Sequence, residues 1–279
     1  MTMTYPGVTS MLAVRGGETV LEWYEEGTEA DVLRELRSMT KVVTTTLIGI
    51  AMAEGYLRSV EQPVAEFFPG YEADVTLREL LTMTSGIDFD DRQIPELLGT
   101  EPNWTDVMLR QRVDAEKGFR YKAVDMHLLS VILTKVTGRN ALKYAEEKLF
   151  GPLGIETCFW PCDPQGHSNG STGLKMTTGD LAKLGRLFLQ KGRWDGKQVV
   201  PEAWVEQATM AQSGHDPRFG TYGYAWWVAE EGFMAAGAAG QYLRILPGQD
   251  LTLVVTSDPQ RGSHETVGLL QELLERVGA

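Results

Sequence analysis

The sequence predicts an α/β protein in which strands from both ends of the chain form one antiparallel sheet flanked by helices. Strand-like patterns are concentrated near the two termini, whereas helical patterns fill the middle of the chain. Each element has to bury its apolar face against another, so we expect the middle to form a mostly helical second lobe. Residues 1–60 and 170–279 are expected to form the sheet domain and residues 61–169 the helical domain, with the active site between them.

The predicted strands begin with a hairpin. Residues 8–14 and 19–24 are rich in strand-forming side chains, and Gly16-Gly17 between them suits a tight turn. Four further strands are predicted near the other end of the chain, with Pro247-Gly248 as a turn between the last two. They cover residues 223–229, 233–236, 241–246 and 251–257.

The predicted helices begin with residues 38–54. Ser38 is a good residue to start a helix and Gly55 a good residue to end one. Apolar side chains cover most of the circumference of this segment, which is typical of a buried helix. Further helical patterns cover residues 77–83, 104–112, 125–137, 141–149, 178–190, 202–208 and 264–277.

Composition narrows the possible partners of the protein. The 279 residues carry a net charge of −12, which argues against nucleic acid or an anionic membrane as a partner, since both reward clustered Lys and Arg. The most apolar stretch, residues 42–53, is too short to span a bilayer. Residues 1–7 have neither the basic start nor the apolar run of a secretory signal, so we expect a cytoplasmic protein. The sequence leaves the oligomeric state open.

Metal and redox chemistry have little support in the sequence. Cys158 and Cys162 are the only cysteines, and the four histidines are scattered without the spacing of metal ligands. We interpret the two cysteines as unpaired thiols near a turn, and we expect neither a metal nor an organic cofactor.

Ser38 and Lys41 point to nucleophilic catalysis. A serine hydroxyl is a poor nucleophile until a base removes its proton. Residues three apart lie on the same face of a helix, so Lys41 can bring its amine beside the Ser38 hydroxyl. Desolvation along the apolar helix and the partial positive charge of its N-terminus both favour the neutral amine that a base requires. The same N-terminus offers a backbone N–H to an oxyanion.

This pair of common residues also has a purely structural interpretation, in which Ser38 caps the helix and Lys41 lies on a solvated face. Two observations count against it. The chain contains no other Ser-x-x-Lys, and this one opens the helix that is predicted to be wholly buried.

Several further segments carry a resemblance to a known family. They resemble, in order and spacing, segments of the β-lactamase-like, penicillin-recognising serine hydrolases, and together they cover most of the chain. The chain looks most similar to the carboxylesterase and 6-aminohexanoate (nylon-oligomer) hydrolase branch of that superfamily, which implies a β-lactamase/transpeptidase-like fold. The segments are residues 77–87, 119–121 with 127–130, 173–182 and 222–227.

The resemblance assigns a role to Tyr121, which matches the tyrosine that begins the second motif of the family. Its phenol would lie beside Ser38 and Lys41 and relay a proton to the leaving group or share the role of base; the structural alternative is a half-buried aromatic side chain. Two positions later the family usually has Asn or Ser, whereas this chain has Ala123. That change removes a polar contact to the lysine or to the substrate.

The third family motif, Lys or His followed by Thr or Ser and then Gly, is matched by position at Ala235, Ala236 and Gly237. The resemblance implies that the N–H groups of Ser38 and Ala238 form the oxyanion hole and that this strand lines the substrate site. Small residues that let a strand pack on a helix would explain the alanines equally well. Because Ala235 replaces a cation, the strand has no side chain at this position to hold a substrate carboxylate, which favours uncharged substrates.

The expected function is therefore hydrolysis of small uncharged esters or amides through an acyl-enzyme on Ser38, with Lys41 as base. Three alternatives stay open: a β-lactamase or D-alanyl-D-alanine carboxypeptidase, a non-catalytic ligand-binding homologue, and an acyltransferase. Ala123 and Ala235 support the non-catalytic alternative. The presence of Ser38, Lys41 and Tyr121 together speaks against it, because binding alone does not require such a set.

Overall fold

A computed structural model describes residues 7–94, 100–261 and 267–278. Within these residues eight strands form one antiparallel sheet in the order β2-β1-β12-β11-β10-β9-β8-β7. Two short strand pairs, β3–β4 and β5–β6, lie apart from it. The strands are β1 (Val8–Arg15), β2 (Glu18–Tyr24), β3 (Arg34–Glu35), β4 (Lys175–Met176), β5 (Arg193–Trp194), β6 (Lys197–Gln198), β7 (Ser213–Asp216), β8 (Gly220–Tyr222), β9 (Trp227–Ala229), β10 (Gly232–Gly237), β11 (Gln241–Leu246) and β12 (Leu251–Ser257).

Both ends of the chain contribute to the sheet, as predicted. Strand β1 pairs with its hairpin partner β2 on one side and with β12 on the other, so that Ala13 lies opposite both Leu21 and Leu253. Gly16 and Gly17 connect β1 to β2 with φ of 58° and 86°, the left-handed conformation that a tight hairpin turn requires. The predicted hairpin is confirmed, and so is the prediction that strands from both ends of the chain form one antiparallel sheet.

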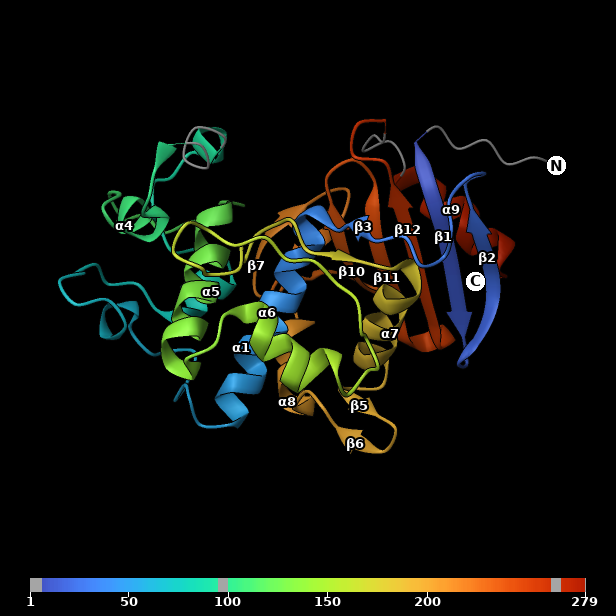
Figure 1. The fold of residues 1–279 in the computed structure, drawn as a ribbon, viewed down its shortest axis with the longest axis horizontal. Coiled ribbons are helices and arrows are strands. Elements are labelled where there is room, and N and C mark those ends of the chain that lie inside the picture. Colours follow the sequence, from blue (N-terminus) through green and yellow to red (C-terminus); the bar gives the residue numbers. More distant parts are fainter. Residues whose placement is uncertain (1–6, 95–99, 262–266, 279) are drawn as a thin grey trace.

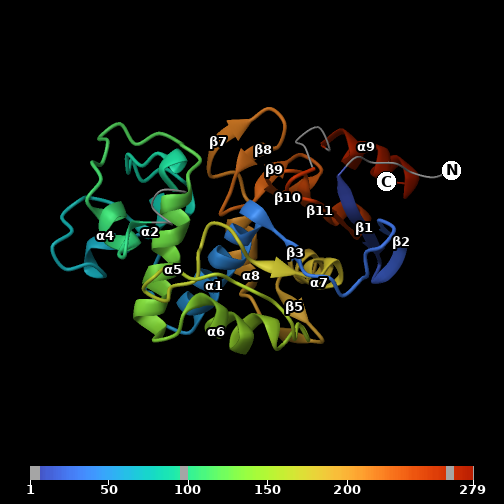
Figure 2. The ribbon, with the colours of Figure 1, turned by 45° about the horizontal axis from the view of Figure 1, so that its top comes forward.

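Helices cover the sheet on both faces and extend away from one end of it. Figure 1 shows α1 between the sheet and the group that contains α4 and α5, and Figure 2 shows α7 and α9 on opposite faces of the sheet. Helix α7 packs against β1, β11 and β12. The helices are α1 (Thr40–Ala53), α2 (Leu77–Leu81), α4 (Trp104–Leu109), α5 (Ala123–Thr137), α6 (Ala141–Ala145), α7 (Thr178–Leu189), α8 (Glu202–Ala208) and α9 (Val267–Arg276).

Helix α1 is the buried centre of the molecule, as its apolar circumference predicts. Every residue from Thr40 to Ala51 is buried, and the helix packs against α5 and α6. It ends at Gly55, which follows the C-cap with a left-handed φ of 80°. Gly49 brings the backbone of α1 against the Trp204 ring, because a Cβ at this position would lie 2.3 Å from that ring.

The structure differs from the sequence-based expectation in several places. A short 3-10 turn, η1 (Arg37–Met39), precedes α1, so that Ser38 lies in this turn and the α-helix begins at Thr40. Strands β7 and β8 are unpredicted, because their residues are polar and lack alternation. Residues 223–226, predicted as strand, form a turn in which Gly223 passes close to the Ala208 carbonyl and Ala225 has a φ of 68°.

Two further expectations concern the cysteines and the membrane. Cys158 and Cys162 are both free thiols. In the part of the chain that the structure describes, every helix is too short or too polar to cross a membrane. Residues 264–266 of the predicted last helix lie outside the described residues.

Candidate active site

Ser38 and Lys41 meet where η1 joins α1. The Lys41 amine nitrogen, Nζ, lies 2.9 Å from Ser38 Oγ and donates a hydrogen bond of 2.9 Å to the Ser171 carbonyl oxygen. The Lys41 residue is only 4% exposed, whereas Ser38 is partly exposed and lines a cavity. One N–H of the amine is thus committed to an oxygen that can only accept, and the rest of the amine faces the hydroxyl.

This arrangement differs from the structural interpretation of the Ser-x-x-Lys pattern. No side-chain hydrogen bond caps the start of η1 or of α1, so the Ser38 hydroxyl is not used as a helix cap. Lys41 lies inside the protein and not on a solvated face. A buried amine in contact with a hydroxyl that reaches a cavity is the geometry that proton transfer between the two requires.

The loop that carries the Ser171 carbonyl is fixed on both sides. The Asn169 side-chain oxygen accepts from the N–H and the hydroxyl of Ser171, at 3.1 Å and 2.9 Å. Thr44 of α1 donates to the Gly170 carbonyl at 2.9 Å. On the other side, Gly170 lies so close to α5 that a Cβ there would be 2.2 Å from the Met126 carbonyl oxygen. The acceptor that holds Lys41 is therefore rigid.

Tyr121 lies beside the pair, immediately before α5. Its ring centroid is 5.1 Å from Lys41 Nζ, so the contact between the two side chains runs through the ring face. The ring stacks on Trp227 at 5.9 Å and meets the buried Tyr222 edge-on at 5.8 Å. These rings fix the plane of Tyr121 and leave it 38% exposed toward solvent.

A buried ion pair lies behind Tyr121. Asp125 is fully buried, accepts from the Ser85 hydroxyl at 2.6 Å, and has Lys122 Nζ 3.7 Å away. Burial raises the pKa of Asp125 to about 7, although Lys122 and Ser85 act in the opposite direction. Burial likewise lowers the pKa of Lys122. Both groups are shifted toward their neutral forms because little solvent reaches them.

The turn between β10 and β11 lines the same cavity as Ser38. Gly237 allows this turn to touch the segment before Ser38, because a Cβ there would lie 2.6 Å from the Leu36 carbonyl oxygen. The Gln241 side chain holds the turn from inside, donating to the Ser257 carbonyl at 2.7 Å and accepting from the Ser257 N–H at 3.1 Å. Ala238, the next residue of this turn, lines the same cavity as Ser38.

The cavity that Ser38 opens into has a volume of about 300 Å³. Its lining combines four aromatic rings with three small residues and part of a charged hairpin. The aromatic residues are Phe119, Tyr121, Phe219 and Trp227, and the small residues are Ala236, Gly237 and Ala238. The residues of the β7–β8 hairpin are His215, Asp216 and Arg218, of which Arg218 pairs with Asp216 at 2.8 Å.

The residues expected at the site from the sequence fall into two groups. Ser38, Lys41 and Tyr121 come together, and Ala236, Gly237 and Ala238 line the same cavity as Ser38. Ala235 and Ala123 do not line it: Ala235 is 1% exposed, and Ala123 begins α5. Ser171 and Arg218 were not expected, because their positions depend on contacts between distant segments that leave no local pattern.

Comparisons with known proteins show the family and the fold of the chain. The Beta-lactamase family model matches residues 2–276. The 6-aminohexanoate-dimer hydrolase of Paenarthrobacter ureafaciens is 25% identical over 300 residues, covering 95% of this chain and 76% of that protein.

Two solved structures share the fold of the chain. A penicillin-binding protein from Bacillus halodurans matches with a TM-score of 0.79 at 15% identity, covering 96% of this chain and 97% of that one. A class C β-lactamase from Rhodobacter sphaeroides matches with a TM-score of 0.74 at 19% identity, covering 98% and 95%. The expected β-lactamase/transpeptidase-like fold is confirmed.

Proposed function

Because the chain belongs to the Beta-lactamase family, and is a serine hydrolase of that family, we propose that it cleaves small uncharged esters or amides through an acyl-enzyme on Ser38. The observation that carries the proposal is the position of Lys41 Nζ, 2.9 Å from Ser38 Oγ and anchored by Ser171. A base in contact with its nucleophile, beside a cavity, is the arrangement that nucleophilic catalysis needs.

In the first step neutral Lys41 takes the Ser38 proton while Oγ forms a bond to the substrate carbonyl carbon. The N–H groups of Ser38 and Ala238 stabilise the resulting oxyanion, and each such donor contributes about 3 kcal/mol in other hydrolases. The proton then passes from Lys41 to the departing alkoxide or amine as its bond to the carbonyl carbon breaks. In the structure Lys41 contacts the Tyr121 ring face, so the phenol takes part in this transfer only when its hydroxyl turns toward the leaving group. Water then attacks the acyl-enzyme and gives a proton to Lys41, which passes it to Ser38 Oγ as the bond between Oγ and the acyl carbon breaks and the acid leaves.

The lining of the cavity supports a small apolar acyl group as the part of the substrate next to Ser38. Aromatic rings and small alanines and glycine form most of its wall, and the charge of Arg218 is already balanced by Asp216. The relative from Paenarthrobacter is named for hydrolysis of a 6-aminohexanoate dimer, which supports amides beside esters.

Arg218 favours a second candidate, the β-lactamase. It places a cation in the cavity, although on a different element from the third family motif, and a β-lactam antibiotic carries a carboxylate that such a cation would bind. The pairing with Asp216 weakens this possibility, because a substrate carboxylate would have to compete with the protein's own.

Turnover of p-nitrophenyl butyrate and of a coloured cephalosporin, measured on the same preparation, separates the two candidates. We expect faster turnover of the ester, and loss of it by several orders of magnitude in Ser38→Ala. Ser59→Ala, at an exposed serine, is the matched control and should retain full activity. Faster cephalosporin turnover would establish the second candidate, and ester cleavage unchanged in Ser38→Ala would exclude the proposed mechanism.

A further inference from the structure

A second cavity borders the active-site cavity at the β7–β8 hairpin. Its volume is about 810 Å³, and His215, Arg218 and Phe219 line both cavities. Ser38 and Tyr121 line the active-site cavity but not the second one. The hairpin therefore contributes to the walls of two neighbouring cavities, and only one of them contains the reacting groups.

Apolar side chains from α9, β10 and the hairpin line much of the second cavity. Leu270 and Leu274 lie one turn apart on α9, and both are buried. Met234 of β10 and Phe219 of the hairpin are also buried and line the same space. Figure 2 shows α9 on the face of the sheet opposite α7. An alkyl chain bound here would leave water for an apolar surface.

Arg244 of β11 brings a cation without a partner to this lining. It is half-buried and lies opposite Met234 in the register of β10 and β11, so the two side chains share one face of the sheet. Within the part of the chain that the structure describes, its guanidinium forms no hydrogen bond or ion pair. Burial lowers the pKa of Arg244, although Glu231 acts in the opposite direction. The fork of a guanidinium matches the two oxygens of a carboxylate.

The other charged side chains of the second cavity restrict where an anion can bind. Arg218 is already paired with Asp216 at 2.8 Å. Glu230 and Glu231, in the turn between β9 and β10, are exposed to solvent and repel an anion from their part of the cavity. Arg244 is consequently the position at which a carboxylate is favoured.

A series of side-chain contacts joins the second cavity to the reacting groups. The Phe219 ring centroid lies 5.6 Å from that of Trp227, whose ring stacks on Tyr121 at 5.9 Å. The Tyr121 ring in turn has Lys41 Nζ over it at 5.1 Å. Close-packed side chains transmit displacement, so a ligand that presses on Phe219 acts on the groups around Ser38.

We propose that the second cavity binds a free carboxylic acid with an apolar chain and that its occupancy lowers turnover of bulky acyl groups at Ser38. Arg244 binds the carboxylate, and Met234 and the two leucines of α9 contact the chain. A ligand packed against Phe219 limits how far the shared hairpin can move to admit a large acyl group. Binding itself requires no catalysis, whereas the effect on turnover rests on the proposed function.

Calorimetric titration of the Ser38→Ala protein with sodium decanoate tests the site without interference from turnover. We expect saturable binding that is weakened about tenfold in Arg244→Gln, because the carboxylate loses a charged hydrogen-bond partner. Arg244→Lys keeps the charge and should retain part of the affinity. Arg276→Gln, at an exposed arginine of α9 outside the lining, is the matched control and should bind decanoate normally. Decanol, which lacks the carboxylate, should bind about tenfold more weakly than decanoate.

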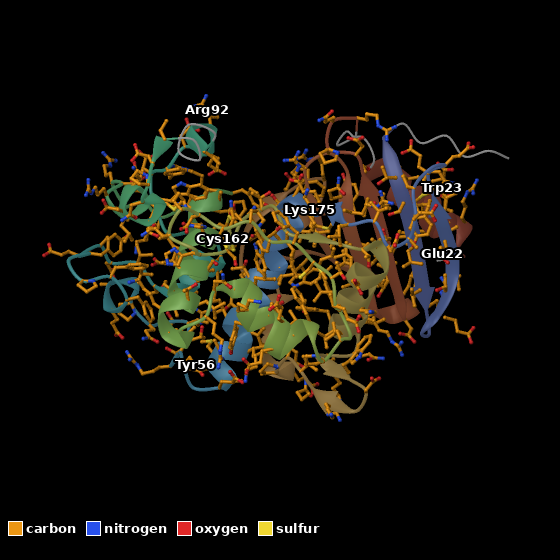
Figure 3. All side chains as sticks on the ribbon, viewed as in Figure 1. Glu22, Trp23, Tyr56, Arg92, Cys162 and Lys175 are labelled. Atoms are coloured by element: carbon orange, nitrogen blue, oxygen red, sulfur yellow. The ribbon has the colours of Figure 1, made fainter. Side chains whose placement is uncertain are left out.

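Prior labelling of Ser38 with a fluorophosphonate separates the two cavities. The adduct occupies the cavity that Ser38 lines, so decanoate should still bind to the labelled protein. Tryptophan fluorescence then tests the contact between Phe219 and Trp227. Decanoate should change the emission, and Trp227→Phe should remove most of that change. Trp23→Phe, on β2 at the edge of the sheet (Figure 3), should leave the change intact.

Steady-state kinetics of the active enzyme test the effect on turnover. Decanoate should lower kcat/KM for p-nitrophenyl octanoate about fivefold or more and leave kcat/KM for p-nitrophenyl acetate nearly unchanged. Competition for the active site would instead lower both values equally. In Arg244→Gln the same concentration of decanoate should have little effect on either ester.

The inference would be overturned by decanoate binding that is undiminished in Arg244→Gln or abolished by labelling of Ser38. Binding without any effect on octanoate turnover, or with an equal effect on both esters, would contradict the coupling between the cavities. Failure of the proposed function would appear differently, as ester turnover that survives Ser38→Ala.

Discussion

The contact between Gly237 and the segment before Ser38 makes a sharp prediction. In Gly237→Ala the new Cβ would lie 2.6 Å from the Leu36 carbonyl oxygen, 3.0 Å from Gln241 Cβ and 3.1 Å from Arg37 Cβ. Ordinary contacts of a Cβ begin at 3.4 Å, so the β10–β11 turn and the Ser38 turn must separate by about 0.8 Å. The atoms in the way are a backbone oxygen and two Cβ atoms, which are fixed to the backbone, so rotation of a flexible side chain cannot relieve the clash.

In the proposed mechanism, a separation of this size moves the Ala238 N–H away from the substrate oxygen that becomes negatively charged when Ser38 attacks. Displacement by about 1 Å costs roughly 100-fold in other enzymes, and loss of one oxyanion donor roughly 100- to 1,000-fold. We expect kcat for p-nitrophenyl butyrate to fall about 100-fold with little change in KM. The fold should survive, with the free energy of unfolding lowered by about 1–3 kcal/mol.

Steady-state kinetics far below the melting temperature, combined with urea unfolding, test this prediction. Gly248→Ala is the matched control, because a Cβ at that position meets no other atom within 4 Å. A Gly237→Ala enzyme that keeps more than half of its kcat would refute the reasoning that the Gly237 contact positions the oxyanion hole.

Three further predictions concern the buried ion pair, the cavity and the Ser171 loop. The folded pKa of Asp125, about 7, lies above the value of about 3.9 in an unfolded chain, so the protonated side chain stabilises the fold fully below pH 4, and this stabilisation is lost as pH rises through 7. In urea unfolding, the free energy of unfolding should therefore fall by about 1.4 kcal/mol per pH unit across this window relative to Asp125→Asn. Plots of that free energy against pH that run parallel for the two proteins would contradict this prediction. Ala236→Leu should narrow the cavity and lower kcat/KM for p-nitrophenyl octanoate at least tenfold more than kcat/KM for p-nitrophenyl acetate. Ala229→Leu, at a residue outside this cavity, is the control and should change kcat/KM for neither ester. An equal loss on both esters would show that the acyl group binds outside this cavity. Gly170→Ala should push the Ser171 loop away from the Met126 carbonyl and reduce kcat roughly tenfold or more. Gly179→Ala is the control and should keep its kcat. A Gly170→Ala enzyme with full activity would contradict this prediction.

Most of the fold could be predicted because its elements carry strong local patterns. The hairpin of β1 and β2, the buried helix α1 and the strands β11 and β12 each combine the correct periodicity with a turn or stop residue at the end. The β7–β8 hairpin could not be found in this way. Its residues are polar and are held by pairing with β9 and by the aromatic wall of the cavity, and both are tertiary effects.

The candidate site could be predicted only where its residues lie close in sequence or in a family motif. Ser38 and Lys41 are one helical turn apart, so the spacing alone placed them together. Ser171 holds the same amine through its backbone carbonyl from 130 positions away, and a carbonyl has no sequence signature. Asp91 reaches Ala123 across 32 positions, so the polar group near the start of α5 comes from a segment that the motif does not include.

The claim that Ser38 is the nucleophile and Lys41 its base is tested most directly by a fluorophosphonate probe. Peptide mass spectrometry of the labelled protein should locate a single adduct on Ser38. Lys41→Ala should slow the labelling by several orders of magnitude, because the hydroxyl then keeps its proton, whereas Lys183→Ala should label at the normal rate. An adduct on another residue, or undiminished labelling of Ser38 without Lys41, would contradict the account.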